Sequence, residues 1–174
     1  SFRAIGMLDF DESTDQTTPL EWFDPFIPSW TKFSFHDHPP LVFAVQHVFM
    51  RLFGETTVAF RLPSALLGIA SVSLLYLIGK KLYNERTGLL AAALFGATVN
   101  HVVVSRLGLQ EAYVIFFLLW AIYAYLKAEI QKKYYLLMGA LIGLGLLTKY
   151  TTGILIPILI THMLFFRRRD LLCR

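Results

Sequence analysis

The side chains of this sequence that could do chemistry fall in three places, and the first is a short cluster near residue 37. His36, Asp37 and His38 stand directly before Pro39 and Pro40. Imidazole and carboxylate groups bind divalent cations, and the two prolines stiffen the chain where it leaves the cluster. Neighbouring side chains of an extended chain do not all face one way, so at most two of the three would bind one ion. An ordinary polar loop is the alternative interpretation.

The second place is the polar break at 105–110, which separates two apolar stretches. Arg106 lies in it and Glu111 directly follows it. Ionisable residues where a chain enters a membrane segment are often functional. Glu111 is therefore a candidate catalytic carboxylate, and Arg106 is a candidate substrate-binding residue. The helix dipole alone also favours a carboxylate at the start of a helix, which is the alternative.

The third place is Lys149, the only charged side chain between residues 136 and 166. Burying an unpaired ammonium group in a membrane is costly, so Lys149 needs a partner or a route to water. Thr148, Tyr150 and Thr151 beside it carry hydroxyl groups. This setting favours a polar site in which Lys149 and Tyr150 bind a phosphate, or in which Lys149 pairs with a carboxylate. Snorkelling of Lys149 to the lipid headgroups is the alternative.

Long apolar stretches place these residues in a membrane. About 20 apolar residues cross a bilayer, so the pattern predicts spans over 62–79, 88–104 and 109–126. The stretch 136–166 is too long for one crossing and is expected to form a hairpin of 136–150 and 151–166. The sequence therefore predicts an all-α fold, a polytopic transmembrane helix bundle over 62–174, with an outward-facing segment over 1–61.

Basic residues in the connections favour the hairpin. With it, three clusters face the same side, as the positive-inside rule requires. They are Lys80, Lys81 and Arg86; Lys127, Lys132 and Lys133; and Arg167, Arg168 and Arg169. Residues 1–61 would then face the exterior, the periplasm or a lumen.

Three further features of the sequence predict local structure. Residues 40–53 are apolar at helical spacing but too short to cross a membrane, so we expect a helix lying in the interface. Pro63 is expected in the first turn of the first span. Gly139, Gly143 and Gly145 form a stripe of small residues that is expected to let helices pack closely.

Composition excludes several classes of protein. Hydrophobic residues make up 56% of the 174 positions and charged residues only 16%, which argues against a soluble domain and against disorder. The net charge of +4 hides an acidic segment over 1–61, with eight carboxylates against four basic residues, and a basic remainder. Cys173 is the single cysteine, which excludes an internal disulfide framework and a cysteine zinc site. We expect no nucleic-acid partner.

An ordered set of short sequences is similar to the membrane glycosyltransferases of the C-type fold (GT-C). Within that superfamily, the chain most resembles the protein O-mannosyltransferases and the bacterial aminoarabinose transferases of lipid A, over about residues 36–170. The sequences that carry the resemblance are His38-Pro39-Pro40-Leu41, Leu52-Phe53-Gly54, Arg61-Leu-Pro-Ser-Ala-Leu-Leu-Gly68, Leu75-Tyr76-Leu77, Ser105-Arg-Leu-Gly-Leu-Gln-Glu111 and Gly143-Leu-Gly-Leu-Leu-Thr-Lys149-Tyr150.

The resemblance implies inverting transfer of a sugar from a polyprenyl-phosphate carrier to a glycan, lipid or protein acceptor outside the cytoplasm. It implies an integral protein of the inner or plasma membrane, or of the endoplasmic reticulum. The family's main Asp-Glu pair and first span are expected upstream of Ser1, so the chain alone is expected to be inactive.

The resemblance also assigns roles to residues. Asp37 matches the family's acidic residue before the Pro pair, His38 matches its basic neighbour, and Glu111 stands where members commonly have Asp. We therefore expect Asp37 and Glu111 to be catalytic and His38, Arg106, Lys149 and Tyr150 to bind substrate. Asp37 and Glu111 are also the candidate ligands for a divalent metal ion, Mg²⁺, Mn²⁺ or Zn²⁺.

Two other classes of function stay open at this point. One is a non-catalytic membrane scaffold or a subunit that binds the lipid carrier. The other is a secondary transporter, which a broken helix near Lys149 would suit.

Overall fold

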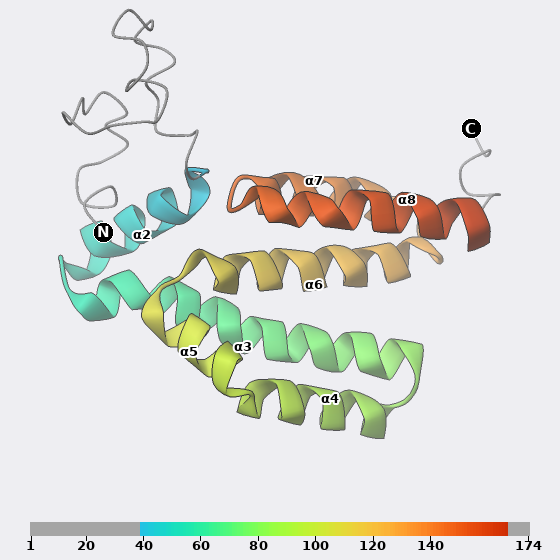
Figure 1. The fold of residues 1–174 in the computed structure, drawn as a ribbon, viewed down its shortest axis with the longest axis horizontal. Coiled ribbons are helices and arrows are strands. Elements are labelled where there is room, and N and C mark those ends of the chain that lie inside the picture. Colours follow the sequence, from blue (N-terminus) through green and yellow to red (C-terminus); the bar gives the residue numbers. More distant parts are fainter. Residues whose placement is uncertain (1–38, 167–174) are drawn as a thin grey trace, which may run out of the picture.

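The computed structural model describes residues 39–166, which form helices and turns with no strand among them (Figure 1). In chain order the helices are α2 (Leu41–Phe53), α3 (Thr57–Leu82), α4 (Glu85–Ala97), α5 (Val99–Leu107), α6 (Gln110–Ala128), α7 (Tyr134–Leu146), the 3₁₀ helix η3 (Tyr150–Ile154) and α8 (Leu155–Phe166). Asp37, His38 and the Arg167–Arg169 cluster lie outside the described residues.

The helices have the length and apolar composition of a membrane protein. Helices α3 and α6 are each long and apolar enough to cross a bilayer, and α4 and α5 together supply a third candidate span. The all-α membrane helix bundle that the sequence predicts is therefore confirmed. The side of the membrane that each end faces stays a prediction.

Helix α3 begins earlier than the sequence predicts. Its N-cap is Thr56, whose Oγ1 accepts a hydrogen bond from the backbone N–H of Ala59 at 3.1 Å. A capping hydroxyl satisfies one of the free donors at a helix start and so sets the first turn at Thr57. Pro63 consequently lies inside the helix, and the prediction that it stands in the first turn is wrong.

The predicted span over 88–104 is not one continuous helix, because two helices form there. Helices α4 and α5 meet at Thr98 with a bend of 61°. Thr98 has an extended backbone (φ −65°, ψ 123°), and its Oγ1 donates to the carbonyl of Leu94 at 2.9 Å. The hydroxyl thus compensates a carbonyl at the end of α4, while the extended residue redirects the chain into α5.

The chain reverses within the predicted hairpin, where α7 runs toward η3 and α8 returns alongside α6 (Figure 1). The carbonyl of Gly145 accepts from the hydroxyls of Thr148 at 2.6 Å and Thr152 at 3.0 Å, which tightens the turn. Buried side chains of α6, α7 and α8 form one core cluster: Ala121, Ala124, Tyr125, Leu141, Ile142, Leu155 and Leu159.

The two ends of the bundle differ in their chemistry. The α3–α4 turn, near Lys80 and Lys81, and the α6–α7 turn, near Lys132 and Lys133, lie at one end (Figure 1). The opposite end gathers α2, the α5–α6 turn and η3. Glu111 and Lys149 are both at this second end, so the fold separates the basic connections from the candidate site.

Glycines bring α3 and α4 into close contact, at positions that the sequence analysis missed. A Cβ on Gly79 would stand 2.8 Å from the Cα of Gly88, and a Cβ on Gly88 would stand 2.7 Å from the carbonyl oxygen of Tyr76. By contrast, a Cβ on Gly139 or Gly143 would meet no described atom within 4 Å. Among residues 39–166, the predicted packing stripe therefore has no partner at these two positions, where both glycines are exposed.

Gly88→Ala is expected to destabilise the bundle by about 1–3 kcal/mol, because the new methyl group meets backbone atoms that cannot move aside cheaply. Gly139→Ala is the matched control, since alanine has open space there and is the better helix former. Thermal unfolding in detergent measures both. Equal melting temperatures for the two variants would contradict the close contact at Gly88.

Candidate functional site

Glu111 and Lys149, predicted separately as site residues, form an ion pair. The Nζ atom of Lys149 donates to Oε1 of Glu111 at 2.7 Å, across 38 positions of sequence. Both side chains are partly open to the surroundings, with 37% of Lys149 and 43% of Glu111 exposed. The arrangement thus places one cation and one carboxylate side by side, where a ligand can reach them.

Local structure explains why Glu111 stands at the head of α6. Gly108 ends α5 in the left-handed conformation (φ 75°), which residues with a Cβ rarely adopt. A Cβ there would also stand 2.8 Å from the ring of Phe60. The chain then restarts as α6, and Glu111 falls in its first turn, where the helix dipole favours a carboxylate.

Lys149 reaches Glu111 because the helix of α7 stops just before it. Helix α7 ends at Leu146, and Lys149 has an extended backbone (φ −162°, ψ 135°) as it leads into η3. Its own backbone N–H still donates to the carbonyl of Gly145 at 3.0 Å. The lysine is therefore held at the turn of the hairpin rather than within a continuous apolar helix.

Helix α2 is tied to both turns that carry the ion pair. The buried side chain of Gln46 donates from Nε2 to the carbonyl of Gly108 at 2.9 Å. At its start, the N–H of Leu41 donates to the carbonyl of Leu147 at 3.0 Å. Helix α2, which begins three residues after His38, is thus fixed beside the turns that carry Glu111 and Lys149. The sequence analysis did not identify Gln46 as a buried residue of this region. Its position between Val42 and Met50, at helical spacing on one apolar face, could have indicated a buried glutamine.

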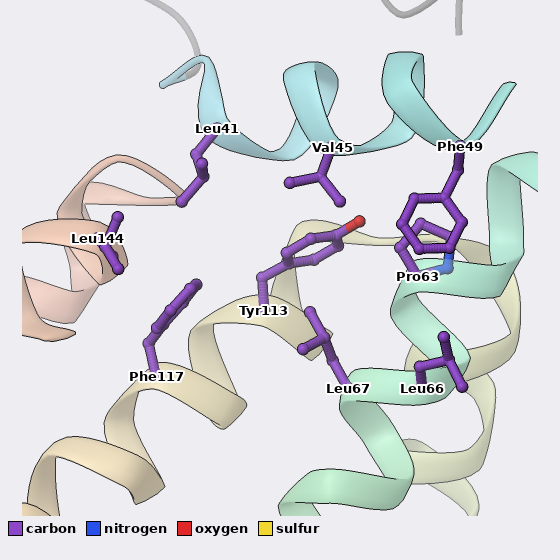
Figure 2. Close-up of a pocket in the computed structure, with 9 residues that line it drawn as sticks. All are labelled: Leu41, Val45, Phe49, Pro63, Leu66, Leu67, Tyr113, Phe117 and Leu144. Carbon is purple, nitrogen blue, oxygen red and sulfur yellow. The ribbon is translucent and has the colours of Figure 1, made fainter. Parts of the chain in front are cut away.

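An apolar cavity of about 320 Å³ lies beneath α2 (Figure 2). Helix α2 lines it with Leu41, Val45 and Phe49, α3 with Pro63, Leu66 and Leu67, α6 with Tyr113 and Phe117, and α7 with Leu144. Tyr113 follows Glu111 by two residues, and its ring extends between α2 and α3 in Figure 2. One residue that lines this apolar cavity is therefore only two positions from Glu111 in the sequence.

The remaining predicted site residues do not join the pair. Arg106 lies in the last turn of α5 and lines a different cavity, whose walls include neither Glu111 nor Lys149. Tyr150 begins η3 directly after Lys149 and is exposed. Asp37 and His38 lie outside the described residues, so their place in the site stays a prediction.

The metal site that Asp37 and Glu111 were predicted to form also stays a prediction. Within residues 39–166, no three His, Cys, Asp or Glu side chains gather at one point. Glu111 is the one carboxylate of the described site, and its Oε1 is engaged by Lys149. Among residues 39–166, this single carboxylate does not hold a metal ion by itself, and the reaction proposed for the site involves none.

The fold and the ion pair define a class of protein: an all-α membrane bundle with a charged pair at one end. Residues 37–174 match the family model described as dolichyl-phosphate-mannose-protein mannosyltransferase. The chain belongs to this family, which confirms the resemblance seen in the sequence.

Two curated relatives come from Bacillus subtilis (strain 168). The protein named "Putative mannosyltransferase YkcB" is 32% identical over 115 residues, which is 65% of this chain and 16% of that protein. The protein named "Putative mannosyltransferase YycA" is 34% identical over 110 residues, 63% of this chain and 16% of that protein. The chain thus matches about a sixth of each relative's length. No solved structure matches it.

Proposed function

We propose that this chain is part of an integral-membrane glycosyltransferase that moves a sugar from a polyprenyl-phosphate carrier to an acceptor outside the cytoplasm. The observation that carries the proposal is the ion pair of Lys149 and Glu111 at the end of the bundle opposite the basic turns. Membership of a mannosyltransferase family supports sugar transfer as the reaction class and mannose as the first sugar to test.

Stability alone does not account for the ion pair. A salt bridge as exposed as this one contributes only about 0–1 kcal/mol to folding, because water screens it and two long side chains lose freedom. An ammonium group held near lipid headgroups, however, attracts a phosphate strongly and is reachable from the bilayer surface. We therefore assign Lys149 to the phosphate of the carrier.

Glu111 then acts as the general base. In the proposed step, an acceptor hydroxyl oxygen forms a bond to the anomeric carbon of the sugar, and the bond from that carbon to the phosphate oxygen breaks. The carrier phosphate keeps the electron pair, and its charge is neutralised by Lys149. The hydroxyl proton passes to the carboxylate of Glu111. Because phosphate leaves readily, no general acid is required.

The neighbouring features suit this carrier. The cavity under α2 is lined by apolar side chains, as the tail of a polyprenyl phosphate requires. Asp37 is four residues before Leu41, a length of chain that spans at most about 14 Å. Leu41 is hydrogen-bonded to Leu147, beside the ion pair, so Asp37 and His38 stay candidates for catalysis and binding, as does Tyr150.

The donor class is the point to test first. Membranes containing the full protein are expected to release mannose from polyprenyl-phosphate mannose to an acceptor, and to leave a nucleotide-linked mannose unused. The measurement follows radiolabelled mannose out of the lipid fraction, with membranes lacking the protein as the control. Transfer from the nucleotide sugar alone would overturn the donor assignment. Carrier binding without any transfer would favour a lipid-carrier-binding subunit instead.

A further inference from the structure

The cavity under α2 offers its occupant no hydrogen-bonding side chain (Figure 2). Eight of its nine lining residues have apolar side chains. The ninth is Tyr113, which is only 1% exposed, and its hydroxyl oxygen is buried and does not face the cavity. The cavity therefore recognises an occupant only by the amount and shape of the apolar group that enters it.

The volume of the cavity suits a short piece of a polyprenyl tail. It measures about 320 Å³, whereas a dry apolar cavity of about 150 Å³ holds one benzene ring. In proportion, the cavity holds about 13 carbon atoms, which is about two to three isoprene units. A long polyprenyl tail must leave most of its units outside.

The cavity lies beside the turns that carry the ion pair, so it receives the units next to the phosphate. Leu41 lines it, and the backbone N–H of Leu41 donates at 3.0 Å to the carbonyl of Leu147, two residues before Lys149. On α6, Tyr113 lines it two residues after Glu111. A phosphate bound at Lys149 would thus have the first units of its tail, and not the far end, next to this cavity.

The rest of the tail has a way out into the bilayer. Leu66 lines the cavity and is also 50% exposed, on helix α3, which is long and apolar enough to cross the membrane. Isoprene units that pass Leu66 are surrounded by lipid chains, as they are in the free carrier. Because lipid is as apolar as a leucine side chain, these units gain no hydrophobic free energy on binding. Tail length beyond the cavity therefore adds no affinity.

We propose that the site selects its carrier by the phosphate and the first two or three isoprene units, and does not recognise the length of the tail. This selectivity rests on the proposed function and adds which part of the donor is recognised. Within a membrane, close packing drives such contacts, since lipid chains and cavity walls are equally apolar. A larger side chain in the cavity should therefore weaken binding of short and long carriers alike.

Binding of polyprenyl phosphates to the full protein in lipid nanodiscs tests the selectivity, with carrier concentrations given per lipid. Farnesyl phosphate has three isoprene units and undecaprenyl phosphate has eleven, and their affinities are expected to agree within about threefold. Leu67→Trp should weaken both by about tenfold, because the indole occupies volume that the first units need. Leu77→Trp is the matched control, since Leu77 lies on the same helix but does not line this cavity. It should leave both affinities unchanged.

Three results would overturn the selectivity, each for a different reason. Binding of undecaprenyl phosphate about tenfold or more tightly than farnesyl phosphate would show that the outer tail is recognised, and would leave the carrier assignment intact. Unchanged affinities in Leu67→Trp would remove the cavity from the site. Failure of both carriers to bind the unaltered protein would overturn the proposed function as well. If Leu67→Trp does not fold, the comparison of the two carriers on the unaltered protein still decides.

Discussion

Glu111→Gln is expected to lower the rate of sugar transfer by about 100-fold or more while the protein stays folded. The substitution keeps the size of the side chain and removes the charge that accepts the acceptor's proton and balances Lys149. Loss of one preorganised electrostatic group in a site commonly has an effect of this size. Because the ion pair is partly exposed, its loss should change stability by only about 1 kcal/mol or less.

The comparison for this result uses membranes that contain equal amounts of each variant. Glu111→Asp should keep a substantial part of the activity, because it keeps the carboxylate and shortens the side chain by only one methylene group. Glu55→Gln removes an exposed carboxylate from the turn between α2 and α3 and should leave transfer unchanged. Normal transfer by Glu111→Gln would remove Glu111 from the chemistry.

The membrane bundle could be predicted from the sequence because a membrane imposes long apolar runs. Both members of the ion pair could also be identified, since a charge in an apolar run is conspicuous. A carboxylate partner for Lys149 was one of the predicted alternatives, but that this partner is Glu111 could not be predicted, because it depends on where the hairpin turns. Gly145 and the hydroxyls of Thr148 and Thr152 set that position through contacts within the turn.

Other features were not readable from residue types. The bend between α4 and α5 arises at Thr98, without proline, from a hydroxyl bond to Leu94 and one extended residue. Close contact at Gly79 and Gly88 depends on which face of each helix meets the other. The stripe at Gly139 and Gly143 has the spacing of a packing motif, yet it meets no described partner within 4 Å. Spacing predicts a shared face, but tertiary packing decides whether the face is used.

Lys149→Met is expected to weaken binding of polyprenyl phosphate by about tenfold or more, because it deletes a charge-assisted contact to the phosphate. The methionine keeps most of the apolar stem, so packing at the hairpin turn is retained. The backbone N–H of Lys149, which bonds to Gly145, is unaffected by the change. Lys132→Met makes the same substitution at an exposed lysine of the opposite end of the bundle and should leave affinity unchanged.

The affinity for polyprenyl phosphate and the melting temperature, both measured on the Lys149→Met protein, test the central claim most directly. The claim is that Lys149 of the ion pair binds the carrier phosphate, and that the pair contributes little to stability. It predicts a loss of affinity of about tenfold or more with a nearly unchanged melting temperature. Unchanged affinity together with a large fall in melting temperature would show that Lys149 is a structural ion-pair partner and would contradict the claim.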